Sequence, residues 1–508
     1  MANLEIQSGG SASRRIFFHA LEPLLVTYTQ ARSVCKRIAT GEAKIRCILI
    51  RCFIGLFVCT LFYVWKTLPV PLSPPVAYHG RMLESSPPDT PALPKYAAVY
   101  TPFEFSPGGG EKVTLYAIKV LQSLGYKVIF FLSHHGCSSS SCIQHTAEIL
   151  VVRGIDFNLL EIVKIDPYQA EERYIHYKAA EFEVFWSIGI TKIPAIFRLG
   201  RRLNLYTCQF PYDIKSPISE EDLSILSSYQ TILSYSNFAE LWTKKLLSSS
   251  FQTLTASNLS IPSLQVLFPP TIERSVSPED MVTFSALKFQ DQELHIAMLG
   301  IFFLGRQNKG HRYGIRAMKS LLVKTEVPIR LHLMGAVQPG HEGHLENLRK
   351  ESEGLPITFH IGASSAEVAT ILKKSLLFWH MTGVDQPSDD TADPASLEHF
   401  GISIVEAMWY GCIPIVLNRG GPVEIVEHGK SGFVAPSVDG FVQYSLSILS
   451  HIHPSPTSHN ITVSPSPPGD RESIASIQMS AMNSTSKFLI SKFESSLSEI
   501  ILKGTRHM

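Results

Sequence analysis

The chain has 508 residues, 45% of them hydrophobic, and carries 45 lysines and arginines against 44 aspartates and glutamates. This length is more than a single hydrophobic core usually serves, so two or three domains are expected. The balanced charge argues against a general nucleic-acid-binding protein, and eight cysteines over such a length exclude a disulfide-dense scaffold.

An apolar stretch at residues 47–66 predicts one transmembrane helix behind an N-terminal tail at residues 1–46. Arg51 lies near one end, where its charge can reach the head groups, and Tyr63 and Trp65 suit the opposite interface. A cleaved signal peptide and a buried core helix are the alternatives. The long polar lead and the lack of a small-residue cleavage site after Trp65 argue against the signal peptide.

The basic residues around this stretch predict its orientation. On its N-terminal side lie Arg32, Lys36, Arg37, Lys44, Arg46 and Arg51. Only Lys66 and Arg81 occur on the other side before Lys95, so the positive-inside rule places residues 1–46 in the cytosol and the rest across the membrane. Residues 67–95 are rich in Pro and Ser and predict an extended stem. Glycosylation sequons agree with this side and begin at Asn258, Asn460 and Asn483.

Cys137 and Cys142 flank a run of serines and could pair in an oxidising compartment, although spacing alone does not establish a disulfide. Together with His134 and His135 they could also supply the four ligands of a zinc site. The sequence does not decide whether these two cysteines form a disulfide.

Residues 96–275 predict a first Rossmann-like domain. A buried strand at 96–100, a glycine-rich turn, a helical pattern at 113–121 and a strand at 128–132 form the opening of a doubly wound parallel sheet. In the turn, Gly109 and Gly110 would let the backbone approach a phosphate or an acceptor closely, with helix-start amides facing it. A tight turn without a ligand is the alternative.

The same order of elements restarts in residues 276–445, which predict a second Rossmann-like domain that binds the donor. Its elements are an apolar run at 295–304, a helix near 312–322 and strands at 330–334 and 376–379. The two domains would face each other across a cleft, where a ligand binds at the carboxyl ends of both sets of strands. A hinge is expected near 270–290, where prolines cluster.

Residues 446–508 predict a flexible loop, rich in Pro and Ser at 453–470, and a C-terminal helix at 472–503. In the first domain, four residues could line an acceptor site, although aromatic residues at this density are more often core. They are Tyr206, Gln209, Phe210 and Tyr212.

Arg306 and Lys309 follow the first strand of the second domain. A guanidinium and an ammonium at the end of a parallel strand could neutralise a diphosphate, whereas a solvated basic turn is the alternative. An acidic loop could bind a metal, but its irregular spacing favours a solvated loop, and no metal site is predicted. Its members are Asp385, Asp389, Asp390 and Asp393.

Glu398 and Glu406 are eight positions apart, about two helical turns. Glu398 lies just before Gly401, and Glu406 lies inside an apolar helical run that ends near Gly411. Two side chains that only accept hydrogen bonds, beside the amides of a helix start, suit a polyhydroxylated and phosphorylated ligand. The segment 418–422 offers further amides before a helix. This pattern indicates a sugar nucleotide.

Together these residues resemble the GT-B retaining glycosyltransferases of family four, over residues 96–435 and the last helix. The most specific part is Glu398-His-Phe-Gly-Ile with Glu406-Ala-Met and Gly411. Supporting matches are Gly108–Val113, Ser236–Asn237, Phe268–Pro270, Gly305–Arg306, Lys309–His311 and Gly420–Pro422. Within the family, the motifs look most like enzymes that add mannose to dolichol-linked oligosaccharides, and their bacterial relatives.

The resemblance implies roles for the second domain. Glu406 would accept hydrogen bonds from the ribose hydroxyls, and Glu398 would contact hydroxyls of the donor sugar. Backbone amides of Phe400, Gly401 and Ile402 would hold sugar and phosphate.

It also implies how the leaving group is handled. Arg306 and Lys309 would stabilise the departing diphosphate, and Gly109 and Gly110 would close the site from the first domain. The donor would be GDP-mannose or a UDP-sugar, with no metal or other cofactor and no nucleic-acid partner.

We therefore expect a membrane-anchored retaining transferase that moves a hexose, mannose or glucose, to a glycan, glycolipid or lipid-linked acceptor in the endoplasmic reticulum or Golgi. A non-catalytic scaffold that binds sugar nucleotides is the alternative. Three features depart from the family. The spacing between Arg306 and Lys309 is compressed relative to many members, which makes the role of Arg306 the more secure of the two. The charge bias predicts a lumenal domain, whereas dolichol-pathway relatives work on the cytosolic face, which is the alternative arrangement here. Trp409 and Tyr410 replace small residues, which would reflect packing against the sheet.

Overall fold

The computed structural model describes residues 95–103, 109–133, 142–152, 154–165, 182–194, 200–212, 218–387, 389, 391–452 and 471–506. The predicted tail (1–46), anchor (47–66) and stem (67–95) lie outside these ranges, apart from Lys95. Within the ranges, no helix is both long and apolar enough to cross a membrane. Both sheets described below belong to the same compact part of the chain.

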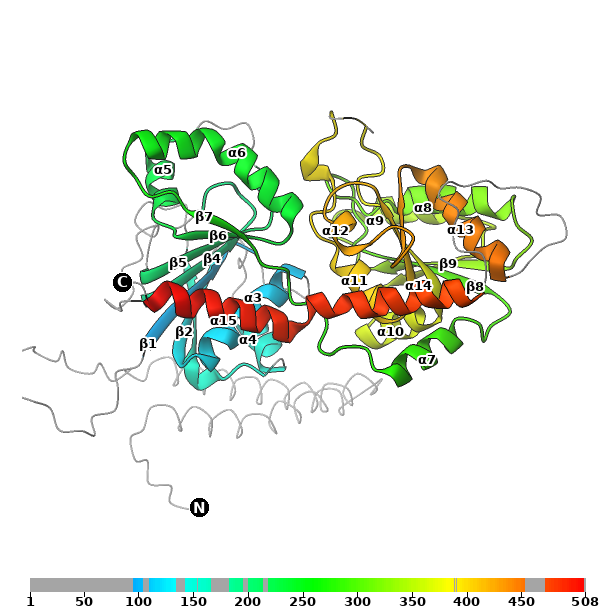
Figure 1. The fold of residues 1–508 in the computed structure, drawn as a ribbon, viewed down its shortest axis with the longest axis horizontal. Helices are drawn as coiled ribbons and strands as arrows, with labels where there is room; N and C mark the ends of the chain where they lie inside the picture. The colour runs from blue at the N-terminus through cyan, green and yellow to red at the C-terminus, as the bar shows by residue number, and fades with distance from the viewer. Residues whose placement is uncertain are drawn as a thin grey trace, which may run out of the picture. The chain divides into compact units, whose positions relative to one another are not determined.

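The first sheet has seven strands in the order β3-β2-β1-β4-β5-β6-β7, all paired in parallel (Figure 1). They are β1 (Lys95–Thr101), β2 (Tyr126–Ser133), β3 (Leu160–Ile165), β4 (Phe182–Gly189), β5 (Gly200–Cys208), β6 (Thr231–Ser234) and β7 (Ser263–Val266). The helices between them are α3 (Gly109–Ser123), α4 (Cys142–Val152), α5 (Glu220–Ser227) and α6 (Asn237–Ala256), with a 3₁₀ turn η1 (Phe157–Leu159). The strands predicted at 96–100 and 128–132 are confirmed.

Both faces of this sheet are covered, which explains its continuously apolar strands. Ala97 and Val99 point to the face where α3 and the last helix pack, whereas Ala98 and Tyr100 point to the face covered by α5 and α6. All four are at most 1% exposed.

The second sheet has six parallel strands in the order β10-β9-β8-β11-β12-β13. They are β8 (Leu294–Leu299), β9 (Ile329–Gly335), β10 (Ile357–Ile361), β11 (Ser375–His380), β12 (Ile413–Leu417) and β13 (Phe433–Ala435). The accompanying helices are α7 (Pro278–Leu287), α8 (His311–Leu322), α9 (Glu342–Glu351), α10 (Ser365–Lys374), α11 (Ile402–Trp409), α12 (Pro422–Ile425) and α13 (Val438–Ile452), with a 3₁₀ turn η2 (Pro394–Ser396). The two predicted parallel α/β sheets are therefore present.

The segment expected as a hinge near 270–290 contains helix α7. Ser277 and Asp280 form a reciprocal capping box at its start, and Pro278 occupies the first helical position, where it needs no hydrogen-bond donor. One of the clustered prolines that indicated a hinge, Pro278, therefore belongs to the start of a helix.

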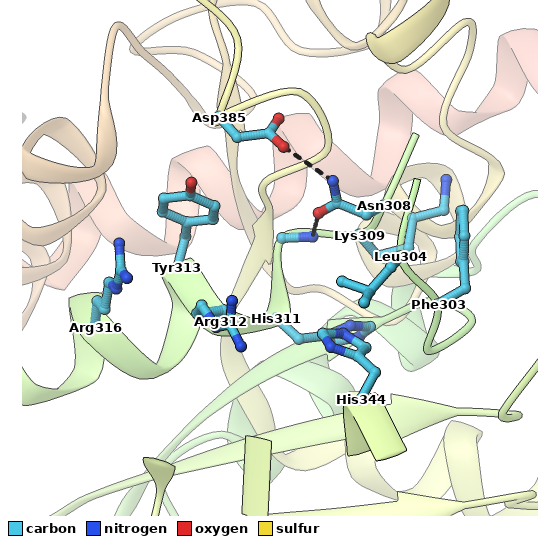
Figure 2. Close-up of a pocket in the computed structure, with 11 residues that line it drawn as sticks. Phe303, Leu304, Asn308, Lys309, His311, Arg312, Tyr313, Arg316, His344 and Asp385 are labelled. Atoms are coloured by element: carbon cyan, nitrogen blue, oxygen red, sulfur yellow. Dashed lines mark hydrogen bonds between the residues drawn. The ribbon is translucent and has the colours of Figure 1, made fainter. Parts of the chain in front are cut away.

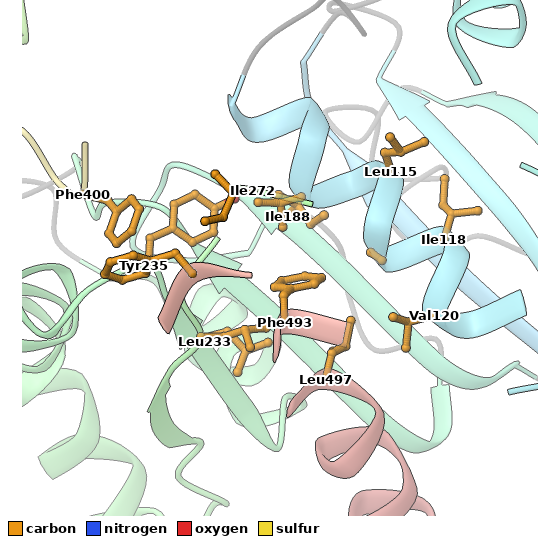
Figure 3. Close-up of a cluster of buried hydrophobic side chains, with 14 of the residues drawn as sticks. Leu115, Ile118, Val120, Ile188, Leu233, Tyr235, Ile272, Phe400, Phe493 and Leu497 are labelled. Atoms are coloured by element: carbon orange, nitrogen blue, oxygen red, sulfur yellow. The ribbon is translucent and has the colours of Figure 1, made fainter. Parts of the chain in front are cut away.

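The C-terminal segment is two helices where the apolar pattern predicted a single helix at 472–503. Helix α14 (Arg471–Ser484) packs on α11 and β12 of the second sheet, a 3₁₀ turn η3 (Thr485–Phe488) follows, and α15 (Ile490–Arg506) packs on α3, β4 and β5 of the first (Figure 1). Figure 3 shows Phe493 and Leu497 of α15 in the same buried cluster as Leu115 and Ile118 of α3. The segment predicted as one helix is therefore divided between two cores, with Ile474 and Ile477 of α14 in the cluster of the second sheet.

Candidate functional site

The predicted site residues lie where the strands of the second sheet end. Strands β8 and β11 are neighbours, but the chain leaves β8 toward one edge of the sheet and β11 toward the other. Such a reversal of strand order opens a crevice at the carboxyl ends of the strands. The loop after β8 carries Arg306 and Lys309, and the loop after β11 carries Glu398.

Glu398 is held by three donors that all reach the same oxygen. Its Oε2 lies 2.9 Å from Lys309 Nζ, 3.1 Å from His380 Nε2 and 3.5 Å from Thr382 Oγ1. The Glu398 side chain is 13% exposed. Burial raises its pKa, but the Lys309 charge and the His380 hydrogen bond outweigh burial and hold the pKa well below its ordinary value. Glu398 is therefore an oriented carboxylate and not a proton donor at neutral pH.

Arg306 is the more exposed of the two predicted cations, with 57% of its side chain exposed. Its Nε lies 3.0 Å from Asp393 Oδ2 in the acidic loop, while Asp385 accepts a hydrogen bond from Asn308. Asp393 also caps the short turn η2. Among the described residues, no cluster of three or more His, Cys, Asp or Glu side chains could hold a metal ion.

Helix α11 begins directly after the Glu398 loop. Gly401 precedes it with a φ of 110°, where a Cβ would lie 2.6 Å from Ile404 Cδ1, so this position requires glycine. The amides of Ile402 and Ser403 have no partner within the helix and are available to an anion, whereas the Ile404 amide donates to the Gly401 carbonyl oxygen at 3.0 Å. The Phe400 side chain is 3% exposed and lies among Phe268 and Phe488, so only its backbone can serve the predicted role.

Glu406 lies on α11 and faces a residue from the first sheet's part of the chain. Lys112 Nζ lies 3.7 Å from Glu406 Oε1 and 2.5 Å from the carbonyl oxygen of Thr271. The Glu406 side chain is 34% exposed. Burial raises its pKa, and the Lys112 charge opposes that rise.

Gly109 and Gly110 form the first turn of α3, and the preceding Gly108 lies outside the described residues. A Cβ on Gly109 would lie 2.7 Å from Ile402 Cδ1, and one on Gly110 would lie 2.9 Å from Gln209 Nε2. The start of α3 thus contacts the Ile402 side chain at the start of α11, and a side chain at position 109 would require Ile402 to move. This places Gly109 beside the predicted phosphate-binding amides.

His380 is a site residue that the sequence reading missed. It is 4% exposed, and because an ionised carboxylate only accepts hydrogen bonds, its Nε2 carries the hydrogen donated to Glu398. The sequence feature that could have identified His380 is its position directly after the apolar run 376–379. This position is the carboxyl end of a parallel strand, where ligands bind in such sheets.

His399 lies inside the most specific motif but received no role. Its ring stacks on Phe210 with centroids 3.9 Å apart, and its Nδ1 accepts a hydrogen bond of 2.9 Å from Gln307 Nε2. Burial lowers the pKa of His399 to about 3, so the ring is neutral. Tyr212 donates to Gln307 Oε1 at 2.9 Å and joins the same network. His399 therefore packs and aligns the loop that carries Glu398.

One expectation needs correction, and a second is refined. In the segment 418–422, expected to offer free amides, the amides of Asn418, Arg419 and Gly421 each donate to a carbonyl oxygen at 2.8 Å, and the helix after it, α12, has only four residues. Trp409 and Tyr410 pack on Phe284 of α7, with ring centroids 5.6 Å away in both cases, and on the core cluster that contains Phe378 and Val416 of the second sheet.

The four residues predicted to line an acceptor site or to belong to the core, Tyr206, Gln209, Phe210 and Tyr212, fall into two pairs. Tyr206 and Phe210 are at most 1% exposed and belong to the cores, as their density indicated. Tyr212 and Gln209 instead reach the site, through Gln307 and Gly110 respectively.

A pocket of about 150 Å³ lies beside the Lys309 loop, at the start of α8 (Figure 2). Asn308 donates a hydrogen bond to Asp385 at one side of the pocket. Arg312 and Arg316 line the wall formed by α8. It neighbours the Glu398 site through Lys309, but Glu398 and Glu406 do not line it.

Comparison with solved structures places this architecture in the GT-B class, with two facing parallel sheets and a C-terminal helix that returns to the first. The Anabaena protein HepE, solved in complex with UDP and glucose, matches with a TM-score of 0.51 at 15% identity, over 80% of this chain and 100% of HepE. Residues 290–452 match the family model described as Glycosyl transferases group 1. Over this segment the chain is similar to the glycosyl transferases group 1 family.

Two curated relatives are mannosyltransferases. The Dictyostelium discoideum GDP-Man:Man(3)GlcNAc(2)-PP-Dol alpha-1,2-mannosyltransferase is 30% identical over 200 residues, which are 37% of this chain. The Rhizomucor pusillus alpha-1,3/1,6-mannosyltransferase ALG2 is 24% identical over 379 residues, which are 65% of this chain and 78% of that relative. The match spans only 33% of the Dictyostelium protein.

Proposed function

We propose that this protein is a retaining glycosyltransferase that moves a hexose from a nucleotide sugar to a glycan or lipid-linked acceptor. The observation that carries the proposal is the Glu398 carboxylate. All of its contacts among the described residues fall on Oε2, which leaves Oε1 to accept a hydroxyl of the donor sugar. The neighbouring amides at the start of α11 suit the donor phosphates.

GDP-mannose is the favoured donor. The name of the Dictyostelium relative specifies GDP-mannose, and the Rhizomucor relative is also named as a mannosyltransferase. The alternative is a UDP-sugar, since HepE was solved with UDP and glucose. An oligosaccharide linked to a polyprenyl diphosphate is the corresponding acceptor class.

The proposed reaction breaks the bond between C1 of the hexose and the diphosphate oxygen, and forms a bond from C1 to an acceptor hydroxyl oxygen on the same face. The acceptor proton passes to the departing diphosphate, so no protein base is needed. Lys309 and Arg306 would stabilise the negative charge that develops on the leaving group, which is the main catalytic contribution expected of such a site.

Both cations are paired with carboxylates in this structure, Lys309 with Glu398 and Arg306 with Asp393. A donor diphosphate would therefore share or replace these partners. The exposed Arg306 pair is the weaker of the two, since surface ion pairs contribute little.

We further propose that residues 47–66 anchor the protein in the membrane of the endoplasmic reticulum or Golgi, with residues 1–46 in the cytosol. Asn258 and Asn483 are exposed, as glycosylation requires. Endoglycosidase sensitivity of the protein isolated from cells would support a lumenal site. A complete absence of glycans would favour the cytosolic face.

The Glu398→Gln variant tests the proposed function. The neutral amide accepts weaker hydrogen bonds and leaves Lys309 without its counter-charge, so hexose transfer should fall about 10- to 100-fold. Transfer from GDP-mannose and from UDP-glucose to lipid-linked oligosaccharide acceptors would be measured with the full-length protein.

Glu346→Gln is the matched control, because Glu346 is an exposed glutamate on α9 whose one ion-pair partner in the described part of the chain is Arg349. Undiminished transfer by Glu398→Gln would contradict the proposed role. Donor binding by the wild type without transfer to any acceptor would instead favour the non-catalytic scaffold.

A further inference from the structure

We propose that Lys112 is a positioning residue that holds the Glu406 carboxylate in the orientation that receives the ribose of the donor. This inference rests on the proposed function and adds a residue to it, one that belongs to the part of the chain built around the first sheet. Lys112 follows Gly109 and Gly110 in the first turn of α3.

Three segments that are distant in sequence meet at the Lys112 ammonium. It donates to the Thr271 carbonyl oxygen at 2.5 Å and lies 3.7 Å from Glu406 Oε1. The Thr271 contact fixes the end of a flexible side chain, which lowers the entropy cost of pairing with Glu406. Lys112 is 28% exposed at its side chain, so water still reaches the pair.

In the described part of the chain, Lys112 supplies the cation that pairs with Glu406. Among the described residues, Lys112 is the one cation within 4 Å of the Glu406 carboxylate, and no hydrogen bond to this carboxylate occurs there. Glu398, in contrast, has a lysine and a histidine from its own domain. The surroundings of Glu406 alone disfavour its charge, because burial raises its pKa, and Lys112 is what opposes that effect.

The contact falls on Oε1, so Oε2 is left to accept from a ribose hydroxyl. Both oxygens can accept more than one hydrogen bond when the carboxylate is ionised. Lys112 would therefore aid ribose binding without occupying the position of the ribose. A role limited to tying α3 to Thr271 is the competing explanation.

The two explanations differ in what the Lys112→Met variant should do to different ligands. If Lys112 acts through Glu406, the variant should bind GDP or UDP about fivefold more weakly, the upper range for a partly exposed ion pair. Its affinity for the 2′,3′-dideoxy form of the same nucleotide should stay within about twofold of the wild type. A structural tether would change both affinities equally.

The full-length protein would be titrated with GDP, UDP and their 2′,3′-dideoxy forms by calorimetry. Lys112→Arg should restore most of the affinity, because it keeps the charge. Lys119→Met is the matched control, since Lys119 lies on the same helix, where its ammonium lies over the ring of Tyr116.

The double variant Lys112→Met with Glu406→Gln completes the experiment. Its loss of GDP or UDP affinity should be smaller than the sum of the two single losses, because both changes disrupt one pair. Additive losses, or equal weakening of the ribose and dideoxy forms, would overturn the role of Lys112 while leaving the proposed function intact. A wild-type protein that binds neither GDP nor UDP would overturn the proposed function and this inference together.

Discussion

Glu398 and Glu406 belong to one motif but have opposite electrostatic surroundings. Lys309 and His380 hold the pKa of Glu398 well below its ordinary value, whereas burial raises the pKa of Glu406. Two carboxylates with pKa values moved apart can indicate an acid and a base. Here each has a cation near it, which agrees with the proposed role of both residues as acceptors and not with an acid and a base.

Lys288 shows how a single buried charge affects stability. It is 1% exposed, and its ammonium donates to the carbonyl oxygens of Leu372 and Tyr410, at 2.6 and 2.8 Å, and contacts the Cys412 thiol. Burial lowers its pKa from 10.5 to about 8, although Cys412 opposes this. Its two carbonyl partners tie α10 to the end of α11.

This lysine predicts a rise in stability at alkaline pH. Between the folded pKa of about 8 and the unfolded value of 10.5, the unfolded chain binds more protons, so the free energy of unfolding increases with pH. The full rise corresponds to about 3 kcal/mol for one residue. Between pH 7.5 and 9.5, urea unfolding should show about 2 kcal/mol of this rise in the wild type and a smaller rise in Lys288→Met. Equal rises in both proteins would contradict the buried ammonium.

At the scale of elements, strands and helix starts were the most predictable features. Strands β1, β2, β9 and β11 appear where apolar runs predicted them, because burial on both faces of a parallel sheet leaves a continuous apolar signal. The break between α14 and α15 was not predictable in this way. The apolar stripe continues through it, and only the positions of two separate sheets require the turn.

Helix α15 is bound to the first sheet by a few fully buried side chains, and this predicts a matched pair of variants. Leu497 is 0% exposed, whereas Leu502 on the same helix is 40% exposed. Leu497→Ala should lower the free energy of unfolding by about 3 kcal/mol, since it leaves a cavity between α15 and α3. Leu502→Ala should cost less than about 1 kcal/mol. Urea unfolding curves measure both, and similar losses would show that α15 does not pack as described.

At the scale of the whole molecule, several histidines are buried as neutral rings. Burial lowers the pKa of His311, His332 and His399 to about 3 in each case. Below the unfolded pKa of 6.5, the unfolded chain takes up protons that the folded protein does not. Stability is therefore complete above pH 6.5 and is lost as the pH falls toward 3.

His311 offers the cleanest test of this acid sensitivity, because it stacks on Phe302 and a phenylalanine can keep that contact. At pH 5, one such histidine costs about 2 kcal/mol relative to neutral pH. His311→Phe should therefore lose about 2 kcal/mol less than the wild type between pH 7.5 and pH 5, measured by urea unfolding. Parallel pH profiles would contradict the buried neutral ring.

The sequence alone determined the two parallel α/β sheets and the placement of Arg306, Lys309 and Glu398 at strand ends, because apolar runs, glycine turns and helix starts are local signals. Only the tertiary structure decided what each charged group faces. Lys112, Thr271 and Glu406 meet although they are far apart in sequence, and the exposed Arg306 pairs with Asp393 of the acidic loop. Such contacts depend on strand order and on how helices pack across two sheets, which no local pattern encodes.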